Sequence, residues 1–557
     1  MAASTAVVPR PTPLQIAQAV AGAVPGELSK SPLVGILGVI LGAGIVTLTG
    51  RMLTMGLADL KGHVGVGFDD GAWISSAYNV ALMFIGPFTV YLGGLMGPRR
   101  ILFFAASAFT LICAILPFIH TYSLLIVALV LAGLASGTFY PLTLTFALRN
   151  IPLRFLPFTI ALYATSVDGA VNVAPSLYGW YRDHLSWHWM FWNSAVITPV
   201  MALCIYYGIP ASPAPKRSAA PSFAGFLYAS AGFALLYAAI DQGQRLDWWR
   251  SGVFTALFVS GSFLLLCSVV RRLRSPNPLV DMPYLRQWNT VLLGIGLFLF
   301  RFCLVTTIIL IPQSLAIRGF EADQIGPAII WSAAPLLFLA FIAGCLLASD
   351  FDSRLLMASG FVFMALASYL NAGFTSAWSA PNYYRTELLM GVGQIFAFIG
   401  LVSSIILQGI FSGGLTKPQM ILTFSAYFHT IRLFGGNLGA VFMGHFIAER
   451  EKLHSNLLGL HVQGGNWITD GGIQGLTAGL FSKSPGLPAA TGRAVVLMSG
   501  RLRLQAYTLS FIDGFYLVAW ACVVALLLIA LLRPSPLSYA DLSIVQPRPP
   551  APQETKS

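Results

Sequence analysis

The chain has 557 residues, of which 56% are hydrophobic and only 9% are charged. A soluble protein of this length would carry far more charge, so the composition excludes a soluble globular fold and predicts an all-α protein that crosses a membrane many times. The formal net charge of +12 does not indicate a nucleic-acid-binding protein, because the basic residues are spread over short loops.

Apolar runs long enough to cross a bilayer begin after residue 32 and follow one another almost to the end of the chain. We predict fourteen transmembrane helices, each about 20 residues or longer. Their approximate limits are 33–58, 73–95, 101–119, 123–147, 157–181, 188–208, 223–240, 252–270, 290–312, 326–348, 355–375, 386–411, 420–448 and 507–532.

Shifts in composition divide these runs into groups of six, two and six. A proline-rich basic linker at 210–221 follows the sixth run, and a second polar connection at 275–288 follows the eighth. The glycine-rich stretch 464–500 lies in a long loop that we expect on the outer face, where it is a candidate contact surface. The predicted parts are a cytoplasmic N-terminal segment 1–32, a first six-helix bundle 33–211, a linker with two extra helices 212–288, a second six-helix bundle 289–533 with its outer loop 449–506, and a disordered cytoplasmic tail 534–557.

An even number of spans places both ends of the chain on one side of the membrane. If that side is the cytoplasm, the inner loops hold more Lys and Arg than the short outer loops, as the positive-inside rule requires. The loop 449–506 is also basic and would then lie outside, which is the main observation against this orientation. Long loops follow the charge rule poorly, so we predict that both termini are cytoplasmic.

The fifth run, 157–181, carries an acid near its middle, Asp168, and a proline, Pro175, among small residues. A charged group at mid-bilayer depth is costly, so it is expected to face a bundle interior or a wet cavity. Small residues let helices approach closely, and proline can bend a helix. Asp168 is therefore our first candidate for binding and releasing a proton, with a structural carboxylate as the alternative.

Other charged residues also fall within apolar runs. Arg301 and Arg432 lie near the middle of theirs, and Arg51 lies toward the outer end of the first. An arginine is not easily neutralised, so it needs a carboxylate, carbonyl groups, water or an anionic ligand. Asp513 is a second proton-coupling candidate, although its place near the start of the last run favours a structural bond between helices.

Three arginines against one clear mid-membrane acid predict an electropositive cavity and a substrate that is a weak acid or an anion. Polar residues in or at the ends of the apolar runs either line the binding pocket or join helices by hydrogen bonds. Together with the arginines, the substrate-binding candidates are Tyr78, Asn79, Tyr163, Asn172, Gln313 and Gln394. No cysteine or histidine spacing fits a metal site, and we predict no cofactor, no metal and no nucleic-acid partner.

Several short motifs resemble the 14-helix drug:proton antiporter family of the major facilitator superfamily (the EmrB/QacA type). They occur in the family's order and spacing over nearly the whole chain. They are Trp187–Asn193, Asp241–Trp248, Asn277–Asp281, Arg432–Gly439 and Asp513–Phe515. The resemblance implies export of amphipathic compounds against inward proton flow, by alternating access of two halves in a bacterial inner membrane. It also implies a periplasmic adaptor and an outer-membrane channel as partners.

The chain departs from the family where a conformational latch is expected. The segment Val90–Arg100 keeps Gly97, Arg99 and Arg100, but Gly94 replaces the usual acid. With Pro175, the three retained residues are our latch candidates.

Residues that relay protons in the family are also replaced, since Leu129 stands at the place of an arginine and Thr49 near that of an acid. If transport is proton-coupled, another carboxylate must serve. An uncoupled transporter or a transporter-like sensor remains the alternative. A membrane enzyme is disfavoured, because no nucleophile motif or phosphate-binding loop is present.

Overall fold

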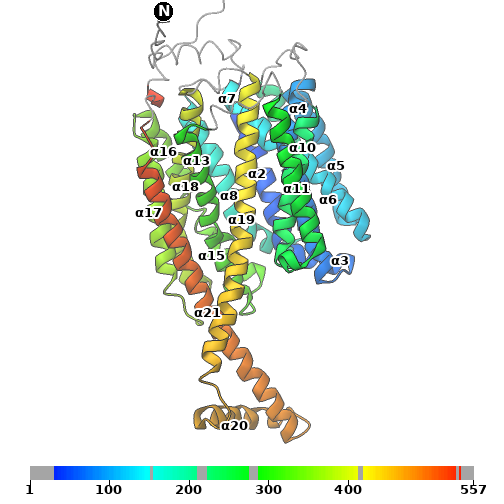
Figure 1. Cartoon of the computed structure of the whole chain (residues 1–557), viewed down its shortest axis with the longest axis vertical. Coiled ribbons are helices and arrows are strands. Elements are labelled where there is room, and N and C mark those ends of the chain that lie inside the picture. The colour runs from blue at the N-terminus through cyan, green and yellow to red at the C-terminus, as the bar shows by residue number, and fades with distance from the viewer. Residues whose placement is uncertain are drawn as a thin grey trace, which may run out of the picture.

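The computed structural model describes residues 31–150, 155–209, 223–274, 286–411, 418–534 and 538–540. Within these ranges every regular element is helical, and the long helices lie side by side in one elongated bundle (Figure 1). The proline-rich linker 210–221, most of the connection 275–288, and nearly all of the predicted N-terminal segment and tail fall outside the described residues.

The first six apolar runs form the N-terminal half. Glycines allow its helices to pack closely, as where α2 meets α9: a methyl group on Gly35 would lie 2.8 Å from the carbonyl oxygen of Gly208. The elements of this half are α2 (Pro32–Met55), α3 (Leu57–Val64), α4 (Phe68–Met96), α5 (Pro98–Ile115), η1 (Leu116–Phe118), α6 (Tyr122–Ser136), α7 (Phe139–Asn150), α8 (Leu156–His184) and α9 (Trp189–Gly208).

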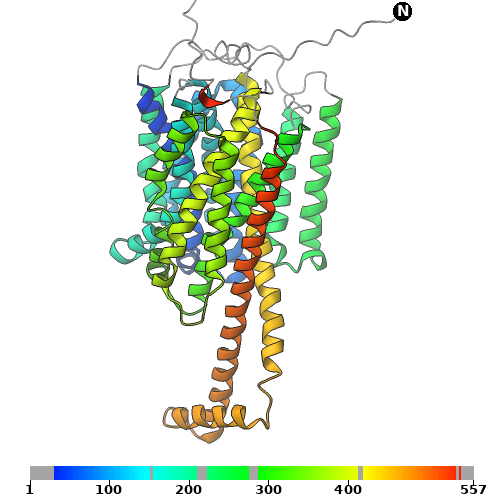
Figure 2. The same ribbon diagram turned by 90° about the vertical axis from the view of Figure 1, so that its left-hand side faces the viewer.

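The next two runs form a helical pair, α10 (Phe223–Gly243) and α11 (Gly252–Leu273), joined through the short helix η3 (Trp248–Arg250). The pair stands at the edge of the bundle (Figure 2). Asp241, at the end of α10, accepts a hydrogen bond from Ser76 of α4, and Arg245 forms an ion pair with Asp69 at 3.1 Å. These contacts attach α10 to the N-terminal half, while Asn437 of α19 donates to the carbonyl of Tyr237 on its other side.

The last six runs form the C-terminal half, in which two helices are interrupted. The first passes through a π-helical turn, and the second is broken between Ile330 and Leu336. The elements are α13 (Trp288–Cys303), η4 (Thr306–Leu310), α14 (Ile311–Ala316), α15 (Ala322–Ile330), α16 (Leu336–Ala348), α17 (Ser353–Asn371), α18 (Ala380–Phe411), α19 (Pro418–Gly459), α20 (Trp467–Phe481) and α21 (Leu487–Ala530).

A helix lies on each of the fourteen predicted runs, and twelve helices in the described part of the chain are long and apolar enough to cross a membrane. The remaining two runs are α8, whose 29 residues include Asp168 and a charged last turn, and the interrupted pair α15–α16. The all-α bundle of the prediction is confirmed, while a total of fourteen crossings stays a prediction.

Residues 449–506 are mostly helical, so the expectation of a long irregular loop was wrong. The helix α19 continues to Gly459, α21 starts at Leu487, and α20 lies across their ends, forming an arm that projects from the bundle (Figures 1 and 2). The 42 residues of α19 span about 63 Å, roughly twice the thickness of a hydrocarbon core. Scattered glycines and low hydropathy suggested a loop, but Asn466 caps α20 by accepting from the N–H of Ile468 at 3.0 Å.

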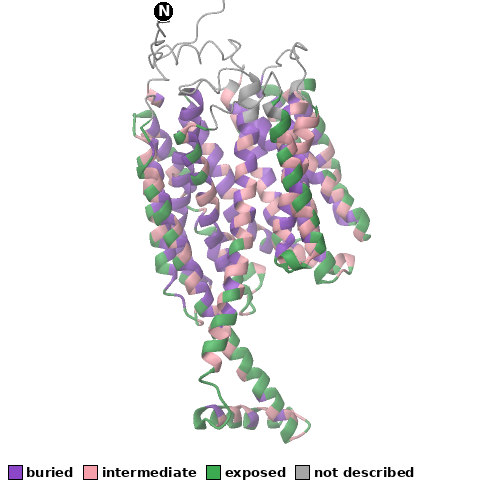
Figure 3. Ribbon diagram, in the orientation of Figure 1, coloured by how far each residue is buried: buried purple, intermediate pink, exposed green. Residues whose placement is uncertain are grey.

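Burial is greatest where the two halves meet. Buried residues fill the centre of the bundle, whereas the arm and the outward faces of α5, α11 and α17 carry many exposed residues (Figure 3). Exposed apolar side chains are expected on helices that face lipid. The polar residues that remain buried at the centre therefore need a separate explanation.

Candidate functional site

The helix α8 lies along the boundary between the halves and touches the C-terminal half over its whole length. Near its end, a methyl group on Gly179 would lie 2.8 Å from the Cα of Asp323, and one on Gly326 would lie 2.6 Å from the Cα of Ser176. Near its start, Phe158 lies against Phe341 with ring centroids 6.1 Å apart. Only residues without side chains permit such close backbone approach, so these glycines fix the distance between α8 and α15.

Asp168 lies between these two contacts. Its side chain is 1% exposed, and neither carboxylate oxygen makes a hydrogen bond. The charged groups that interact with it electrostatically are Arg301 of α13 and Arg432 of α19. The structure thus brings together the three residues that the sequence placed near mid-depth, one from the N-terminal half and two from the C-terminal half.

The two arginines are not neutralised by the single acid. The Cζ of Arg432 lies 3.8 Å from the ring centroid of Tyr140, a cation–π contact, and the Arg301 guanidinium lies against Gly436, where a methyl group would be 2.9 Å from its Nη2. The Nε atoms of both arginines are buried without hydrogen-bond partners. Two guanidinium groups facing one carboxylate leave an excess of positive charge at the centre of the protein.

Aromatic rings surround this charge. Tyr140 stacks on His429 with centroids 5.0 Å apart and meets Tyr163 edge-on at 5.4 Å. His429 is fully buried, and neither of its ring nitrogens makes a hydrogen bond. Tyr163 was a binding candidate from the sequence, whereas Tyr140 was missed, because a tyrosine in an apolar run gives no signal of its neighbours.

A chain of hydrogen bonds crosses the boundary next to this cluster. Asn172 of α8 donates to Gln394 of α18 at 2.8 Å, and Gln394 donates to Thr307 of η4 at 2.9 Å. Arg51 of α2 donates to the carbonyl of Ile308 at 3.1 Å. The π-helical turn η4 therefore receives contacts from two helices, one of them in the other half, and π-helical turns are frequent at functional sites.

Three other candidates from the sequence lie elsewhere. Tyr78 shares a hydrogen bond of 2.9 Å with Ser136, which joins α4 to α6 inside the N-terminal half. Asn79 is half-buried on α4, and Gln313 is exposed on α14. For these residues, the role of joining or covering helices fits the structure better than the role of lining a pocket.

Asp513 lies at the base of the arm. It forms an ion pair with Arg450 at 2.6 Å and a hydrogen bond with His454 at 2.7 Å, and its side chain is 24% exposed. This arrangement matches the structural alternative that the sequence left open. It joins α19 to α21 and is separate from the cluster around Asp168.

The latch candidates occupy a tight turn and its surroundings. Gly97 has φ +83° between α4 and α5, a conformation that favours glycine. Arg99 donates to the carbonyl of Tyr206 at 2.8 Å and lies over its ring, whereas Arg100 is exposed. Pro175 is buried within α8, directly before Ser176, where the helix meets Gly326 of α15.

Sequence reasoning also missed Glu387. The predicted span began at residue 386, but α18 starts at Ala380, so Glu387 lies two turns inside the helix and is fully buried. The polar stretch 382–387 before the apolar run hid it.

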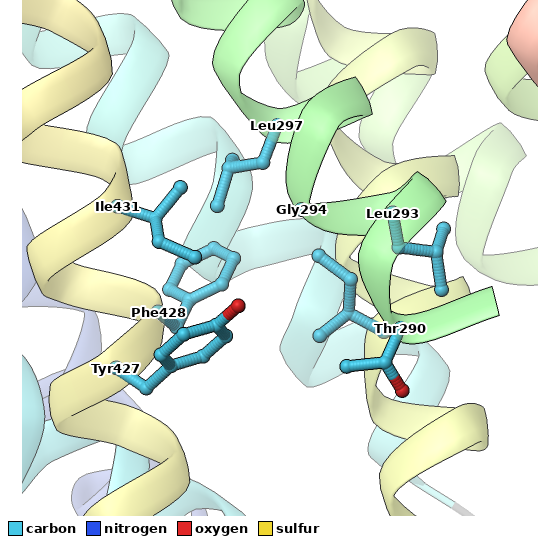
Figure 4. A pocket seen from close by; sticks show the side chains of 8 residues that line it. Thr290, Leu293, Gly294, Leu297, Tyr427, Phe428 and Ile431 are labelled. Atoms are coloured by element: carbon cyan, nitrogen blue, oxygen red, sulfur yellow. The ribbon is translucent and has the colours of Figure 1, made fainter. Parts of the chain in front are cut away.

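A small pocket is present in the C-terminal half, between α13, α18 and α19 (Figure 4). Leu293, Leu297, Tyr427, Phe428 and Ile431 are among its lining residues, and its volume of about 20 Å³ holds little more than one water molecule. It is too small for an organic substrate. Asp168 is likewise closed to solvent in this structure.

Comparison with known proteins identifies the fold and the class. The sequence profile of the Major Facilitator Superfamily matches residues 39–440. The chain belongs to the major facilitator superfamily. It is 23% identical over 410 residues to the fatty acid resistance protein FarB of Neisseria gonorrhoeae, covering 72% of this chain and 78% of that protein. It is 22% identical over 412 residues to the multidrug export protein EmrB of Escherichia coli K12, covering 73% and 78%.

The structure is similar to that of the proton:xylose symporter XylE, with a TM-score of 0.52 and 11% sequence identity over 91% of this chain and 98% of that one. These findings confirm the resemblance to EmrB-type proteins and the major facilitator fold. The protein is a multi-pass membrane transporter and not an enzyme. In a transporter of two halves, a buried charged cluster at their contact is the expected place for a substrate and a coupling ion.

Proposed function

We propose that this transporter exports amphipathic organic compounds across a bacterial inner membrane in exchange for protons. The names of its relatives, a multidrug export protein and a fatty acid resistance protein, support export of such compounds. The observation that carries the proposal is the convergence of Asp168, Arg301 and Arg432, from both halves, in one buried cluster. A group at this boundary changes its surroundings whenever the halves rock.

Asp168 is the proton-binding residue in this mechanism. As a carboxylate without hydrogen bonds, it is costly to keep ionised in a closed, dry bundle. When the halves open toward the side of higher proton concentration, water reaches Asp168 and a proton binds. When they open to the other side, the two arginines favour the ionised form and the proton leaves.

The arginines also select the substrate. Because Arg301 and Arg432 face a single acid, one of them can hold a substrate carboxylate while Asp168 is ionised, and Asp168 takes up its proton after the substrate has left. Tyr163, which meets Tyr140 edge-on, offers an apolar ring to the rest of the same molecule. The cluster therefore favours amphipathic weak acids over lipophilic cations.

We further propose that the arm contacts a periplasmic adaptor that leads to an outer-membrane channel. The arm projects beyond the end of the bundle, and its exposed apolar side chains include Trp467 at 83% and Val496 at 68%. Side chains of this kind in an aqueous compartment favour a protein partner. This placement puts the arm outside and both ends of the chain in the cytoplasm.

Asp168→Asn tests the proposal. The whole protein is reconstituted in proteoliposomes, with decanoate as the anionic probe and ethidium as the cationic probe. We expect uptake driven by an imposed pH gradient to fall at least about tenfold, while counterflow exchange of decanoate without a gradient stays within about twofold. A neutral amide of the same shape keeps the rocking motion but cannot carry a proton.

Asp513→Asn is the matched control, because it removes an acid from an apolar run away from the cluster; it should keep both activities. Loss of both activities in Asp168→Asn, or of neither, contradicts the assignment of Asp168. Transport that is insensitive to the gradient in the unmodified protein favours an uncoupled transporter.

A further inference from the structure

A second acid is buried in the bundle and has no part in the mechanism above. Glu387 on α18 is fully buried, and neither of its carboxylate oxygens makes a hydrogen bond. Among the described residues no arginine, lysine or histidine forms an ion pair with it. If Glu387 were ionised, it would have no counter-charge. Asp168, by contrast, faces two arginines.

The surroundings of Glu387 are polar but not basic. The hydroxyl of Thr307 on η4 lies within reach of its carboxyl group, and Tyr383, one turn earlier on α18, is the titratable neighbour. Tyr383 shares a hydrogen bond of 3.1 Å with Ser314 of α14. Arg318 interacts with Tyr383 and donates to the carbonyls of Ser314 and Trp378.

Hydrogen bonds connect this acid to the one in the other half. Glu387 and Gln394 are seven residues apart on α18, so they share a face of the helix. Gln394 donates to Thr307 and accepts from Asn172, and Asn172 lies one turn from Asp168 on α8. Thr307 thus faces Glu387 and also bonds to Gln394, which binds the N-terminal half.

We propose that Glu387 is a second proton-binding site of the transport cycle, coupled to Asp168 through Thr307, Gln394 and Asn172. This inference rests on the proton-coupled transport proposed above and extends it from one acid to two. Water delivers one proton to a carboxylate oxygen of Glu387 when the arm side opens, and water removes the same proton later in the cycle. The ionised form needs the Thr307 hydroxyl as a donor, and a hydroxyl that donates to a carboxylate accepts more strongly, so loss of the proton strengthens the bond that Thr307 accepts from Gln394.

The position of Glu387 fits proton uptake from the arm side. It lies two turns from the start of α18, and the loop before α18 lies at the arm end of the bundle (Figure 1). The residues between it and that end are Tyr383, Ser314 and Arg318, which form a small polar cover. Separation of α14 from α18 would break the bond between Ser314 and Tyr383 and open this cover.

Infrared difference spectroscopy on the purified whole protein tests the site without any ligand. Between pH 5 and pH 10 we expect two separate protonated-carboxyl components that persist above the range where exposed acids ionise. Glu387→Gln should remove one component and Asp168→Asn the other, and Glu387→Asp should retain a shifted component. Glu449→Gln, which removes an acid that is 52% exposed, is the control and should leave both unchanged. A Glu387→Gln spectrum identical to that of the unmodified protein would overturn the inference.

Transport of decanoate in proteoliposomes separates this inference from the proposal on which it rests. We expect Glu387→Gln to lower the number of protons moved per decanoate by about half, measured with a pH dye inside the vesicles, while counterflow exchange stays within about twofold. An unchanged proton count in Glu387→Gln, together with lost coupling in Asp168→Asn, overturns the second site and leaves the proposed function intact. An unchanged count in both variants overturns both. These proton counts are interpreted only if Glu387→Gln elutes from gel filtration as a single folded species.

Discussion

Asp168 and Asp513 both stand in apolar runs, yet the structure gives them opposite surroundings. Asp513 lies at the base of the arm, partly exposed, with Arg450 and His454 within 2.7 Å. Asp168 lies at the contact between the halves, 1% exposed, with two arginines nearby and no hydrogen bond to either oxygen. A satisfied acid stabilises one arrangement of its neighbours, whereas an unsatisfied acid favours whichever arrangement supplies water or a proton.

Replacing the arginines beside Asp168 or beside Asp513 should give the largest difference in decanoate uptake. Arg432→Ala and Arg301→Ala each remove a guanidinium that would contact an anionic substrate, and we expect uptake of decanoate to fall about 100-fold. Arg450→Ala removes an arginine that is already paired with Asp513 and should keep uptake within about twofold. Initial rates in proteoliposomes under a fixed pH gradient measure this.

Ethidium provides the check on charge selection. If the excess of positive charge at the centre selects anions, Arg301→Ala should spare or increase ethidium uptake while it lowers decanoate uptake. Equal losses for both probes would mean that the arginine supports the fold rather than the substrate. An Arg301→Ala variant that loses only ethidium transport would contradict the anion preference outright.

Replacing Asp513 or Asp168 should give the next largest difference. It is measured as a change in the stability of the protein. Asp513→Asn removes a partly exposed ion pair with Arg450 and weakens the hydrogen bond with His454, at a cost of about 1 kcal/mol, so the arm should open more often. Limited proteolysis within residues 449–506 should speed up several-fold. Asp168→Asn removes no hydrogen bond, so it should leave both the proteolysis rate and the melting temperature unchanged or slightly raised. Destabilisation by Asp168→Asn would show that the acid holds the halves together.

Breaking the ion pairs between the end of α8 and the C-terminal half should give a smaller change in stability. Arg182 pairs with Glu321 at 2.6 Å and with Asp323 at 3.6 Å across the boundary, and all three side chains are partly exposed. Arg182→Ala should cost less than about 1 kcal/mol and shift the balance toward the state that is open on the arm side. A cysteine reagent applied to a Ser176→Cys reporter, which replaces one side-chain oxygen by sulfur at the contact with Gly326, should then react a few-fold faster. An unchanged rate would mean that the glycine contacts alone hold this end shut.

The sequence predicted the bundle well, because an apolar run of membrane length has few alternatives to a helix. It also predicted that Asp168, Arg301 and Arg432 lie inside the bundle, because a charge at mid-depth needs an interior position; their roles in transport stay predictions. It could not place Glu387, since the polar residues before it moved the expected start of the helix. It did not predict the helices of the arm, because helices outside the membrane lack a long apolar run. It did not predict Tyr140 either, because the role of this residue depends on neighbours from α8 and α19.

A group of histidines at the arm end of the N-terminal half gives the smallest expected effect. Replacing one of them tests whether the pH dependence of transport comes from these histidines or from the acids between the halves. The ring centroid of His63 lies 4.5 Å from that of His120 and 6.4 Å from that of His188. Burial, and then the charge of a neighbouring histidine, lower the pKa of His63 and of His188 below the ordinary value of 6.5. Folding therefore favours their neutral forms, so the stability they contribute is complete above about pH 6.5 and is lost as the pH falls below it. His63→Gln should reduce the fall in melting temperature between pH 7.5 and pH 5 by a few degrees at most.

The pH dependence of decanoate transport should be unchanged in the same variant, since in the proposed mechanism that dependence belongs to the acids at the contact between the halves. A shifted transport profile in His63→Gln would move part of the proton coupling from the centre of the bundle to its surface.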